Sequence, residues 1–523
     1  MPEHLRALVV ILALAGPVFL LAKPTLVAFA VAEDEFNRRR NLWLAVTLIA
    51  FLSHSFWIFL AVTAALLLIA GRRETNPMAM FAMLMFAIPP ISAPLSGLGL
   101  VNQLFVLDYP RLLALCLLLP AAIRIARTGA PDSGSFKLAD LLVIGFIATQ
   151  LGLRLLVDSG TNTARHAIYA GLDVGLPYYV ASRSLRDVRA FRGVLASFVL
   201  AAMVMAPVAI FESVRHWLLY APLQYALDVS WGLGSYLYRG GFLRSQGTTG
   251  QPIVLGYIFV VALGCHAYLR RRIPVRSMWW LGFMLLIGGL IASFSRGPWV
   301  AAIAGLVVFR LTAPEAVGGL LKASVGLGAL VAVVMSMPLG ADVISFLPFV
   351  GSVETENVVY RQQLLDVSFN LILQNPWFGS VGYADALAAQ DLVIGGMVDI
   401  VNTYIAIGLA NGLVGLSCFA GAFLVVAFGV LRAMWRLPDR SAEAHTLGSG
   451  LLACIAGAMV TIFTVSSISF IPLVYWTLLG LGAGYVRMLQ SHVPAAPDNQ
   501  SAPQGRFTRP AGAGISGQGA NAA

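Results

Sequence analysis

Long apolar runs separated by short polar loops extend from the first residues of the chain to about position 488. Each run is continuous and lacks the strict alternation of an outer-membrane β-barrel, and in lipid such runs satisfy their backbone only as helices. Most approach the roughly 20 residues that cross a bilayer, so the pattern predicts an all-α polytopic integral membrane protein with about 14 transmembrane helices (range about 12–14). The predicted spans lie at about 5–22, 41–70, 78–94, 109–126, 138–157, 167–182, 190–211, 250–269, 277–294, 297–311, 318–338, 402–430, 447–466 and 471–488.

The composition agrees with this fold and excludes an ordinary soluble enzyme. Of the 523 residues, 59% are hydrophobic and 11% are charged, whereas a soluble domain has roughly 25% charged residues. The formal net charge is +10, but the arginines are scattered through short loops and form no basic stripe for nucleic acid. The four cysteines lie inside apolar runs without a C-x-x-C pair, so we expect neither a zinc site nor a disulfide framework.

The most basic loops set the orientation of the spans, because short loops rich in Lys and Arg stay in the cytoplasm. These loops lie at 183–192, 270–276 and 432–440. Counting fourteen spans from them places both chain termini in the cytoplasm. The same count places residues 23–40 outside, although this stretch contains Arg38–Arg40. Two alternatives remain for the first part of the chain: broken or re-entrant spans, or a signal peptide cleaved near residue 32.

Two long loops, 212–249 and 339–401, then face outward within a polytopic membrane domain of residues 1–488. The second loop carries seven acidic residues against a single arginine, Arg361. Within it, apolar residues recur at helical spacing until Asn375–Pro376, which predicts an amphipathic helix along the membrane surface. Residues 489–523 are rich in Ala, Pro, Gly, Gln and Ser, so we expect a disordered cytoplasmic tail.

Three segments of the outer face each lead into a span. They are Arg244–Pro252, with Thr248 and Thr249 as expected helix caps, Ser295–Pro298, with Ser295 as the expected cap, and Asp399–Asn402. Helix N-termini present N–H groups and a positive dipole end, and a guanidinium adds a fork that suits phosphate oxygens. Arg244, Arg296 and Arg361 could therefore converge on one anionic group. The alternative for each arginine alone is an interfacial residue or a loop ion pair.

The anion is expected to be a lipid-linked diphosphate. Nucleotides are made in the cytoplasm, and the chain has no Walker A loop, no G-x-G-x-x-G after a strand and no D-x-D pair that would hold a metal-bound nucleotide. We therefore expect no cofactor and no metal. A lipid diphosphate has its headgroup at the membrane surface, and preorganised arginines would stabilise its departure as an anion.

At these positions the chain resembles the bacterial O-antigen ligase and polymerase superfamily, the Wzy/WaaL-like integral membrane glycosyltransferases of GT-C-like type. The resemblance covers about 240–420 and rests on the order of several short motifs. They are Arg244 with the glycines up to Pro252, Ser295-Arg296-Gly297 with Trp299, Arg361 upstream of Asn375-Pro376-Trp377-Phe378-Gly379, Asn402-Thr403-Tyr404, and Asn411-Gly412.

The resemblance implies a metal-independent glycosyltransferase of the bacterial inner membrane that uses undecaprenyl-diphosphate-linked oligosaccharides at the periplasmic face. Arg244 and Arg296 would hold the donor diphosphate, and Arg361 would assist. Asp399 is the candidate general base for the acceptor hydroxyl. Its alternative role is the N-cap of the following span.

The residue before Asn402 distinguishes alternatives within the superfamily. Ligases of the family usually carry a histidine there, whereas this chain has Val401, which looks more like an exopolysaccharide polymerase. Asn402, together with Gln251, would bind sugar hydroxyls or simply cap a helix. The expected function is thus a polymerase that joins lipid-linked repeat units. The first alternative is an O-antigen ligase that transfers glycan to lipid A-core or protein, and the second is a lipid-linked oligosaccharide flippase.

The expected partners follow from this function. They are the undecaprenyl-diphosphate-linked donor and acceptor and the lipid bilayer, with a chain-length regulator and export machinery as further candidates and no nucleic acid. Gly408 and Gly412 form a G-x-x-x-G pair, which we interpret as close helix packing.

Overall fold

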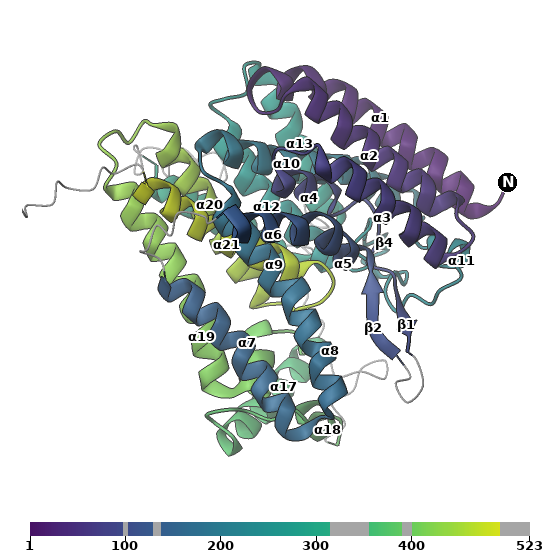
Figure 1. Cartoon of the computed structure of the whole chain (residues 1–523). Helices are drawn as coiled ribbons and strands as arrows, with labels where there is room; N and C mark the ends of the chain where they lie inside the picture. The colour runs from purple at the N-terminus through teal and green to yellow at the C-terminus, as the bar shows by residue number, and fades with distance from the viewer. Residues whose placement is uncertain (98–102, 129–136, 314–354, 390–399, 492–523) are drawn as a thin grey trace, which may run out of the picture.

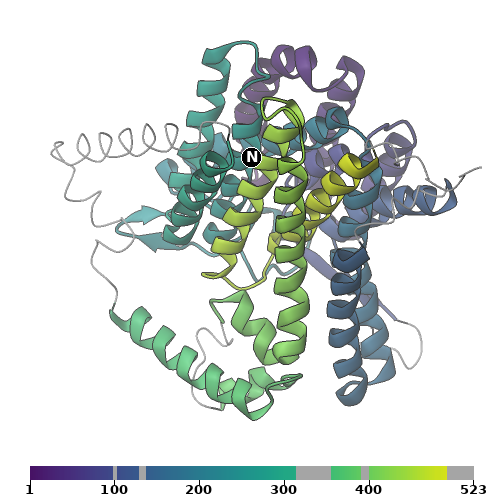
Figure 2. The same cartoon turned by 90° about the vertical axis from the view of Figure 1, so that its left-hand side faces the viewer.

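The computed structural model describes residues 1–97, 103–128, 137–313, 355–389 and 400–491. Within them the chain forms a helical bundle with two short antiparallel β-hairpins (Figures 1 and 2). The elements up to Arg215 are α1 Glu3–Phe29, α2 Glu33–Leu52, α3 Phe56–Arg72, α4 Pro77–Leu84, β1 Ser92–Ser96, β2 Gln103–Asp108, α5 Tyr109–Leu113, η1 Ala114–Leu118, α6 Leu119–Thr128, α7 Lys137–Val157, α8 Gly160–Ala170, η2 Gly171–Gly175, α9 Leu176–Ser184 and α10 Val188–Arg215. The later elements are α11 Leu223–Ala226, β3 Tyr238–Arg239, β4 Phe242–Leu243, α12 Pro252–Leu269, α13 Arg276–Ala292, α14 Arg296–Leu311, α17 Thr355–Gln374, α18 Tyr383–Ala388, α19 Thr403–Trp435, α20 Glu443–Ile462 and α21 Ile471–Ser491.

Seven helices in the described part of the chain are long and apolar enough to cross a membrane, judged by length and composition. They are α1, the continuous stretch Tyr109–Thr128, α7, α10, α12, α19 and α20, and α3 and α13 are shorter apolar helices. The chain is therefore a mostly helical, multi-pass membrane protein, as the apolar pattern predicts. The predicted span 318–338 and the part of the predicted tail beyond residue 491 lie outside the described residues.

Ion pairs gather at one end of the bundle, where two carboxylates each hold two arginines. Glu443 binds Arg192 (2.5 Å) and Arg272 (2.9 Å), and Asp140 binds Arg183 (2.8 Å) and Arg487 (2.6 Å). We call this the basic end. It is where α10 and α20 begin and where α12 and α21 end. The opposite end, where α10 ends and α12, α14 and α19 begin, is called the site end.

The predicted span 41–70 is wrong, because it consists of two helices. The chain leaves helical geometry at Ser53–Ser55, between α2 and α3, and the Phe56 N–H bonds Leu227 O of the site-end loop (3.1 Å). Serine competes with the helical backbone for hydrogen bonds, and these short polar residues interrupt an otherwise apolar run. The break adds one pass of the chain through the bundle. Each helix before it therefore runs in the opposite direction to the predicted one.

As a result, the expectation that residues 23–40 face outward is also wrong. Arg192 donates a hydrogen bond to Phe29 O (2.7 Å) at the basic end, while Trp217 at the site end donates to Glu3 Oε1 (3.0 Å). Helix α1 therefore begins at the site end, and Arg38–Arg40 lie toward the basic end. Since α21 ends at the basic end, the two ends of the described chain lie on opposite sides, which corrects the expectation that both termini share one side.

The predicted span 78–94 is helical only in its first half. Helix α4 stops at Leu84, and residues 85–91 continue as non-helical chain, buried except at Pro90, before β1. The Tyr109 hydroxyl donates to Leu84 O (3.0 Å), at the point where the helix stops. Non-helical backbone at membrane depth is tolerated when the surrounding protein encloses it. Figure 1 shows the β1–β2 hairpin extending beyond the bundle after this segment.

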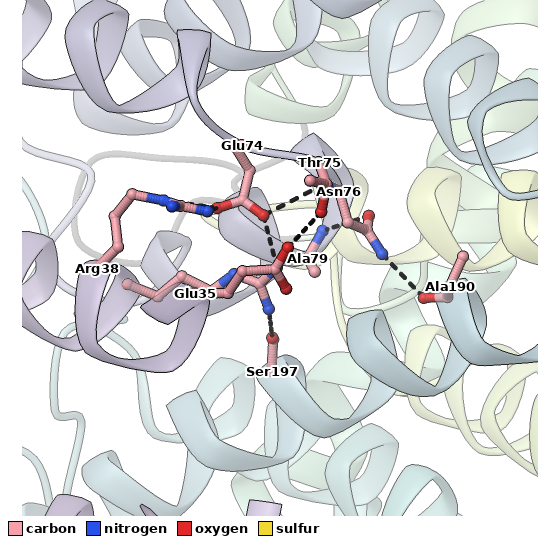
Figure 3. A network of polar contacts seen from close by, with 9 residues as sticks. Glu35, Arg38, Glu74, Thr75, Asn76, Ala79, Ala190 and Ser197 are labelled. Carbon is pink, nitrogen blue, oxygen red and sulfur yellow. Dashed lines mark hydrogen bonds and ion pairs between the residues drawn. The ribbon is translucent and has the colours of Figure 1, made fainter. Parts of the chain in front are cut away.

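A second polar network fixes the α3–α4 connection at the basic end (Figure 3). Glu74 is 3% exposed, and its carboxylate accepts hydrogen bonds from Arg38 Nη2 (2.9 Å) and Arg39 Nη2 (2.6 Å) of α2. Arg39 Nη1 also donates to Ser197 of α10 (3.2 Å). The buried carboxylate is thus compensated by two guanidinium groups, as a buried charge requires, and it joins α2 and α4 to α10.

Candidate functional site

The first predicted arginine follows the β3–β4 hairpin at the site end. The hairpin is laid over the α13–α14 connection: Phe242 stacks on Phe294, with ring centroids 5.4 Å apart, and Arg239 Nη1 donates to Phe294 O (2.8 Å). Arg244 Nη2 then donates to Ser295 Oγ (3.1 Å). Two segments that are 51 residues apart in the chain therefore meet, and Arg244 lies beside the residue that precedes Arg296.

The second predicted arginine begins α14, directly after a tight turn. Phe294 has a positive φ of 44°, which is uncommon for a residue other than glycine, and Ser293 Oγ and Trp299 Nε1 both donate to Leu290 O. Ser295 occupies the N-cap position without the expected capping bond, so this prediction is wrong. Its hydroxyl instead donates to Ser293 O (3.0 Å) and accepts the bond from Arg244.

A buried carboxylate supports the loop between Leu243 and Pro252. Glu212 Oε2 accepts hydrogen bonds from Ser245 Oγ (2.7 Å), Gln246 N (3.0 Å) and Gly247 N (2.9 Å), and Glu212 Oε1 accepts one from Leu219 N (3.0 Å). The Glu212 side chain is fully buried. We define residues 244–251 as the Arg244 loop. Sequence reasoning missed Glu212, and the only signal was one carboxylate near the end of a predicted span.

The connection between α20 and α21 closes the site from a third side. Ser469 Oγ donates to Thr249 O of the Arg244 loop (2.9 Å). The same connection reaches the start of α19, because Thr403 Oγ1 donates to Val465 O (2.8 Å) and Ser467 Oγ donates to Thr403 Oγ1 (3.1 Å). The starts of α12, α14 and α19 are therefore linked by hydrogen bonds at the site end.

The two predicted sugar-binding residues differ in their surroundings. Gln251 occupies the N-cap position of α12, but its side chain makes no capping bond and is half-buried. Asn402 caps α19, since Asn402 Oδ1 accepts hydrogen bonds from Tyr404 N (2.9 Å) and Ile405 N (3.2 Å). Asn402 thus caps a helix, as one of its two expected roles predicts, whereas Gln251 does not. Gln251 remains a candidate for substrate binding.

The expected caps at Thr248 and Thr249 are wrong, because both hydroxyls bond within the interior. The single hydroxyl proton of Thr249 is shared between Gln246 O (2.7 Å) and Gln251 O (2.8 Å), and the oxygen accepts a long bond from Gln251 N (3.4 Å), which precedes α12. Thr248 Oγ1 contacts Met205 Sδ (3.3 Å). The α12 N-terminus therefore has no threonine cap.

Two of the four predicted catalytic residues are not described at the level of their side chains. Asp399 lies outside the described residues. Both roles expected for Asp399, general base and N-cap, therefore concern a residue that the structure does not describe, and the N-cap of α19 is Asn402. Arg361 belongs to α17, and its side chain lies outside the described part of the structure.

Helix α17 is attached to the start of α19 by the Asn375–Ser380 turn. Gly412 of α19 has φ 62° and ψ −164°, which kinks the helix. The turn supplies backbone partners across this kink, since Leu413 N bonds Pro376 O (2.8 Å) and Ser380 N bonds Leu409 O (2.7 Å). Figure 2 shows α17 crossing below α19. Gly412 thus permits a kink at which the Trp377–Phe378 backbone approaches closely, and Gly408 packs against Ile372 of α17, as the interpretation of the G-x-x-x-G pair as close packing predicts.

The site end combines arginine side chains with a helix N-terminus. Arg244 and Arg296 lie close to the N-terminus of α14, where the helix dipole is positive and the first N–H groups have no intrahelical partner. Within the described residues no group of three His, Cys, Asp or Glu side chains is placed to hold a metal ion.

A comparison with known protein families gives a match over part of the chain. The model of the O-antigen ligase family (Wzy_C) matches residues 281–420, which extend from α13 through α14 and α17 into α19. This part of the chain is therefore similar to the O-antigen ligase domain, which supports a relation to the O-antigen ligase/polymerase superfamily. Arg296 and Asn402 lie within the match, whereas Glu212 and Arg244 precede it. No curated protein matches the chain.

Proposed function

We propose that this protein is a bacterial inner-membrane polysaccharide polymerase that joins undecaprenyl-diphosphate-linked oligosaccharide repeat units at the periplasmic face. The observation that carries the proposal is the bond between Arg244 Nη2 and Ser295 Oγ (3.1 Å). It brings two arginine-bearing segments together at the N-terminus of α14. Two guanidinium groups and a helix N-terminus are suited to the oxygens of one diphosphate.

The sidedness of the arginines supports a periplasmic site. Arg183, Arg192, Arg272 and Arg487 gather at the basic end, and the reversal of α1 adds Arg38–Arg40 to it. Loops rich in arginine remain in the cytoplasm. The site end then faces the periplasm, where a lipid-linked glycan would present its diphosphate.

The proposed reaction needs no redox partner. An acceptor sugar hydroxyl attacks the anomeric carbon of the donor, and a new C–O bond forms while the bond from that carbon to the phosphate oxygen breaks. The lipid diphosphate leaves with the electron pair, and Arg244 and Arg296 stabilise its charge, with Arg361 assisting. We assign the hydroxyl proton to Asp399 as the base. Gln251 would position sugar hydroxyls.

The choice of a polymerase over a ligase rests on one position. Val401 precedes Asn402 where ligases resembling this chain carry histidine, and valine has no group that could transfer a proton. The ligase alternative shares the donor and the site and differs in the acceptor. The experiment below therefore offers both acceptors.

The test is reconstitution of the purified full-length protein with lipid-linked repeat units in the presence of EDTA, followed by gel sizing of the products. We expect a ladder of long glycans from the wild type and from R276A, which changes an exposed arginine at the basic end. R296A should insert into the membrane normally and leave single repeat units unjoined. Its yield of long glycans should be lower than that of the wild type by more than about 100-fold.

Other outcomes reject the proposal in identifiable ways. Transfer to added lipid A-core without elongation would favour the ligase alternative. Movement of units across the vesicle membrane without any new glycosidic bond would favour the flippase. An R296A protein that elongates as the wild type does would remove Arg296 from the site.

A further inference from the structure

Glu212 is a fully buried carboxylate at the last turn of α10. It cannot touch a substrate, since its side chain is not accessible. Both of its oxygens are nevertheless engaged, and three of its four bonds go to consecutive residues of the Arg244 loop: Ser245, Gln246 and Gly247. An isolated carboxylate is strongly disfavoured in the protein interior, so Glu212 needs the hydrogen bonds from the loop, and the loop is held in place by Glu212.

The backbone of the Arg244 loop curves around the Glu212 carboxylate. The N–H groups of Gln246 and Gly247 both point at Glu212 Oε2, and Gly247 has a φ of +50°, which glycine adopts without steric cost. Between Leu243 and Pro252 the chain has neither helix nor strand. The three bonds from the loop to Glu212 and the bond from Ser469 to Thr249 O therefore take the place of the backbone hydrogen bonds that a helix or strand would have.

The loop is also held from the side of α13. Ser245 N donates to Ala292 O (3.0 Å), and the preceding residue, Arg244, reaches Ser295 Oγ. Ser213, next to Glu212, donates to Leu243 O (3.0 Å). The residues on both sides of Arg244 are thus held by α10, since Leu243 O accepts from Ser213 and Ser245 Oγ donates to Glu212. These contacts set the direction in which the Arg244 side chain leaves the backbone.

We propose that Glu212 is a positioning residue for the diphosphate site: its carboxylate holds Ser245–Gly247 so that the Arg244 guanidinium faces the N-terminus of α14. The inference rests on the proposed function, because it assigns Glu212 a role in donor binding through Arg244. Glutamine in its place keeps the size but brings an NH2 group against N–H donors and removes the charge that strengthens these bonds.

The test measures binding of radiolabelled farnesyl diphosphate, a short prenyl diphosphate, to the purified full-length protein in nanodiscs. The variants are E212Q, R244A and the double variant. We expect E212Q to raise the Kd by roughly ten- to hundred-fold and R244A to raise it at least as much. In the R244A background, E212Q should change the Kd less than about two-fold, since the two residues act as one unit.

E74Q is the matched control. Glu74 is a glutamate of similar burial, at the basic end, that also accepts hydrogen bonds from neighbouring segments (Figure 3). E74Q and E212Q should both lower the Tm, but E74Q should leave the Kd unchanged. If E212Q cannot be purified, S245A removes one of the four bonds and should raise the Kd by roughly three- to ten-fold.

The outcomes separate this inference from the proposed function. If the wild type binds the probe in an Arg244-dependent manner while E212Q and S245A bind as the wild type does, the role of Glu212 is rejected and the diphosphate site stands. Equal effects of E212Q in the presence and absence of Arg244 would make Glu212 a stability residue only. If wild type and R244A bind the probe equally, the proposed diphosphate site is itself rejected.

Discussion

At the scale of single residues, Asp108 illustrates how burial changes a carboxyl group near the site end. Asp108 Oδ1 caps α5 by accepting from Arg111 N (2.8 Å), and Arg111 Nη1 lies 3.6 Å from Asp108 Oδ2. The same guanidinium also pairs with Asp173 (2.9 Å) and lies over the Tyr169 ring, so Asp108 shares its partner. Burial raises the pKa of Asp108 to about 6, and the charge of Arg111 only partly opposes this rise.

The raised pKa predicts a stability effect with a defined sign. Between about pH 4 and pH 6 the folded protein holds a proton on Asp108 that the unfolded chain releases, so the contribution of Asp108 to stability falls as the pH rises through this range. D108N keeps a capping oxygen and stays neutral. The free energy of unfolding of the wild type relative to D108N should drop by up to about 3 kcal/mol from pH 4 to pH 7.

Thermal unfolding of both proteins in one detergent, at several pH values, measures this difference. D439N is a useful control, because Ser441 lowers the pKa of the exposed Asp439 and the effect should be small and of opposite sign. A wild-type to D108N difference that does not vary with pH would contradict the prediction.

At the scale of elements, the kink of α19 explains how α17 is attached to the rest of the bundle. An α-helix interrupted at Gly412 leaves backbone groups unpaired, and the Asn375–Ser380 turn supplies partners for Leu409, Leu413 and Val414. Gly408 approaches Ile372 of α17 so closely that an added Cβ would lie 3.2 Å from Ile372 Cδ1. The helix that carries Arg361 is therefore attached to α19 both before and at the kink.

G412A should break this attachment. Gly412 has a φ of 62°, a conformation that costs a non-glycine residue about 1–3 kcal/mol. A Cβ added at Gly412 would also lie 2.4 Å from Phe378 N. We expect a lower Tm and faster proteolysis between α17 and α18. The control is G152A on α7, where an added Cβ meets nothing within 4 Å and a helical alanine is favoured by about 0.5–1 kcal/mol. Equal Tm values for G412A and the wild type would show that the kink is not required.

At the scale of the whole molecule, hydropathy predicted where the apolar chain lies better than where it changes direction. Residues 78–91 are apolar both in α4 and in the non-helical stretch after it, so composition could not distinguish the two. Counting the predicted spans was enough to place Arg244 and Ser295 at the same end of the bundle, because each precedes a helix that starts at that end. Glu212 could not be found this way, since its partners are backbone N–H groups that carry no sequence signal.

The break at Ser53–Ser55 gives the topology a direct test. In a variant without the four native cysteines, single cysteines at Pro2, His54 and Ser491, all exposed, can be labelled with a membrane-impermeant maleimide in intact spheroplasts. P2C and H54C lie at the site end and should react before lysis, whereas S491C at the basic end should react only afterwards, like the control R276C. A single helix over 41–70 would instead bury H54C in lipid and place P2C with S491C. Protection of H54C together with reaction of P2C only after lysis would therefore refute the two-helix arrangement, and the assignment of Arg38–Arg40 to the basic end would fail with it.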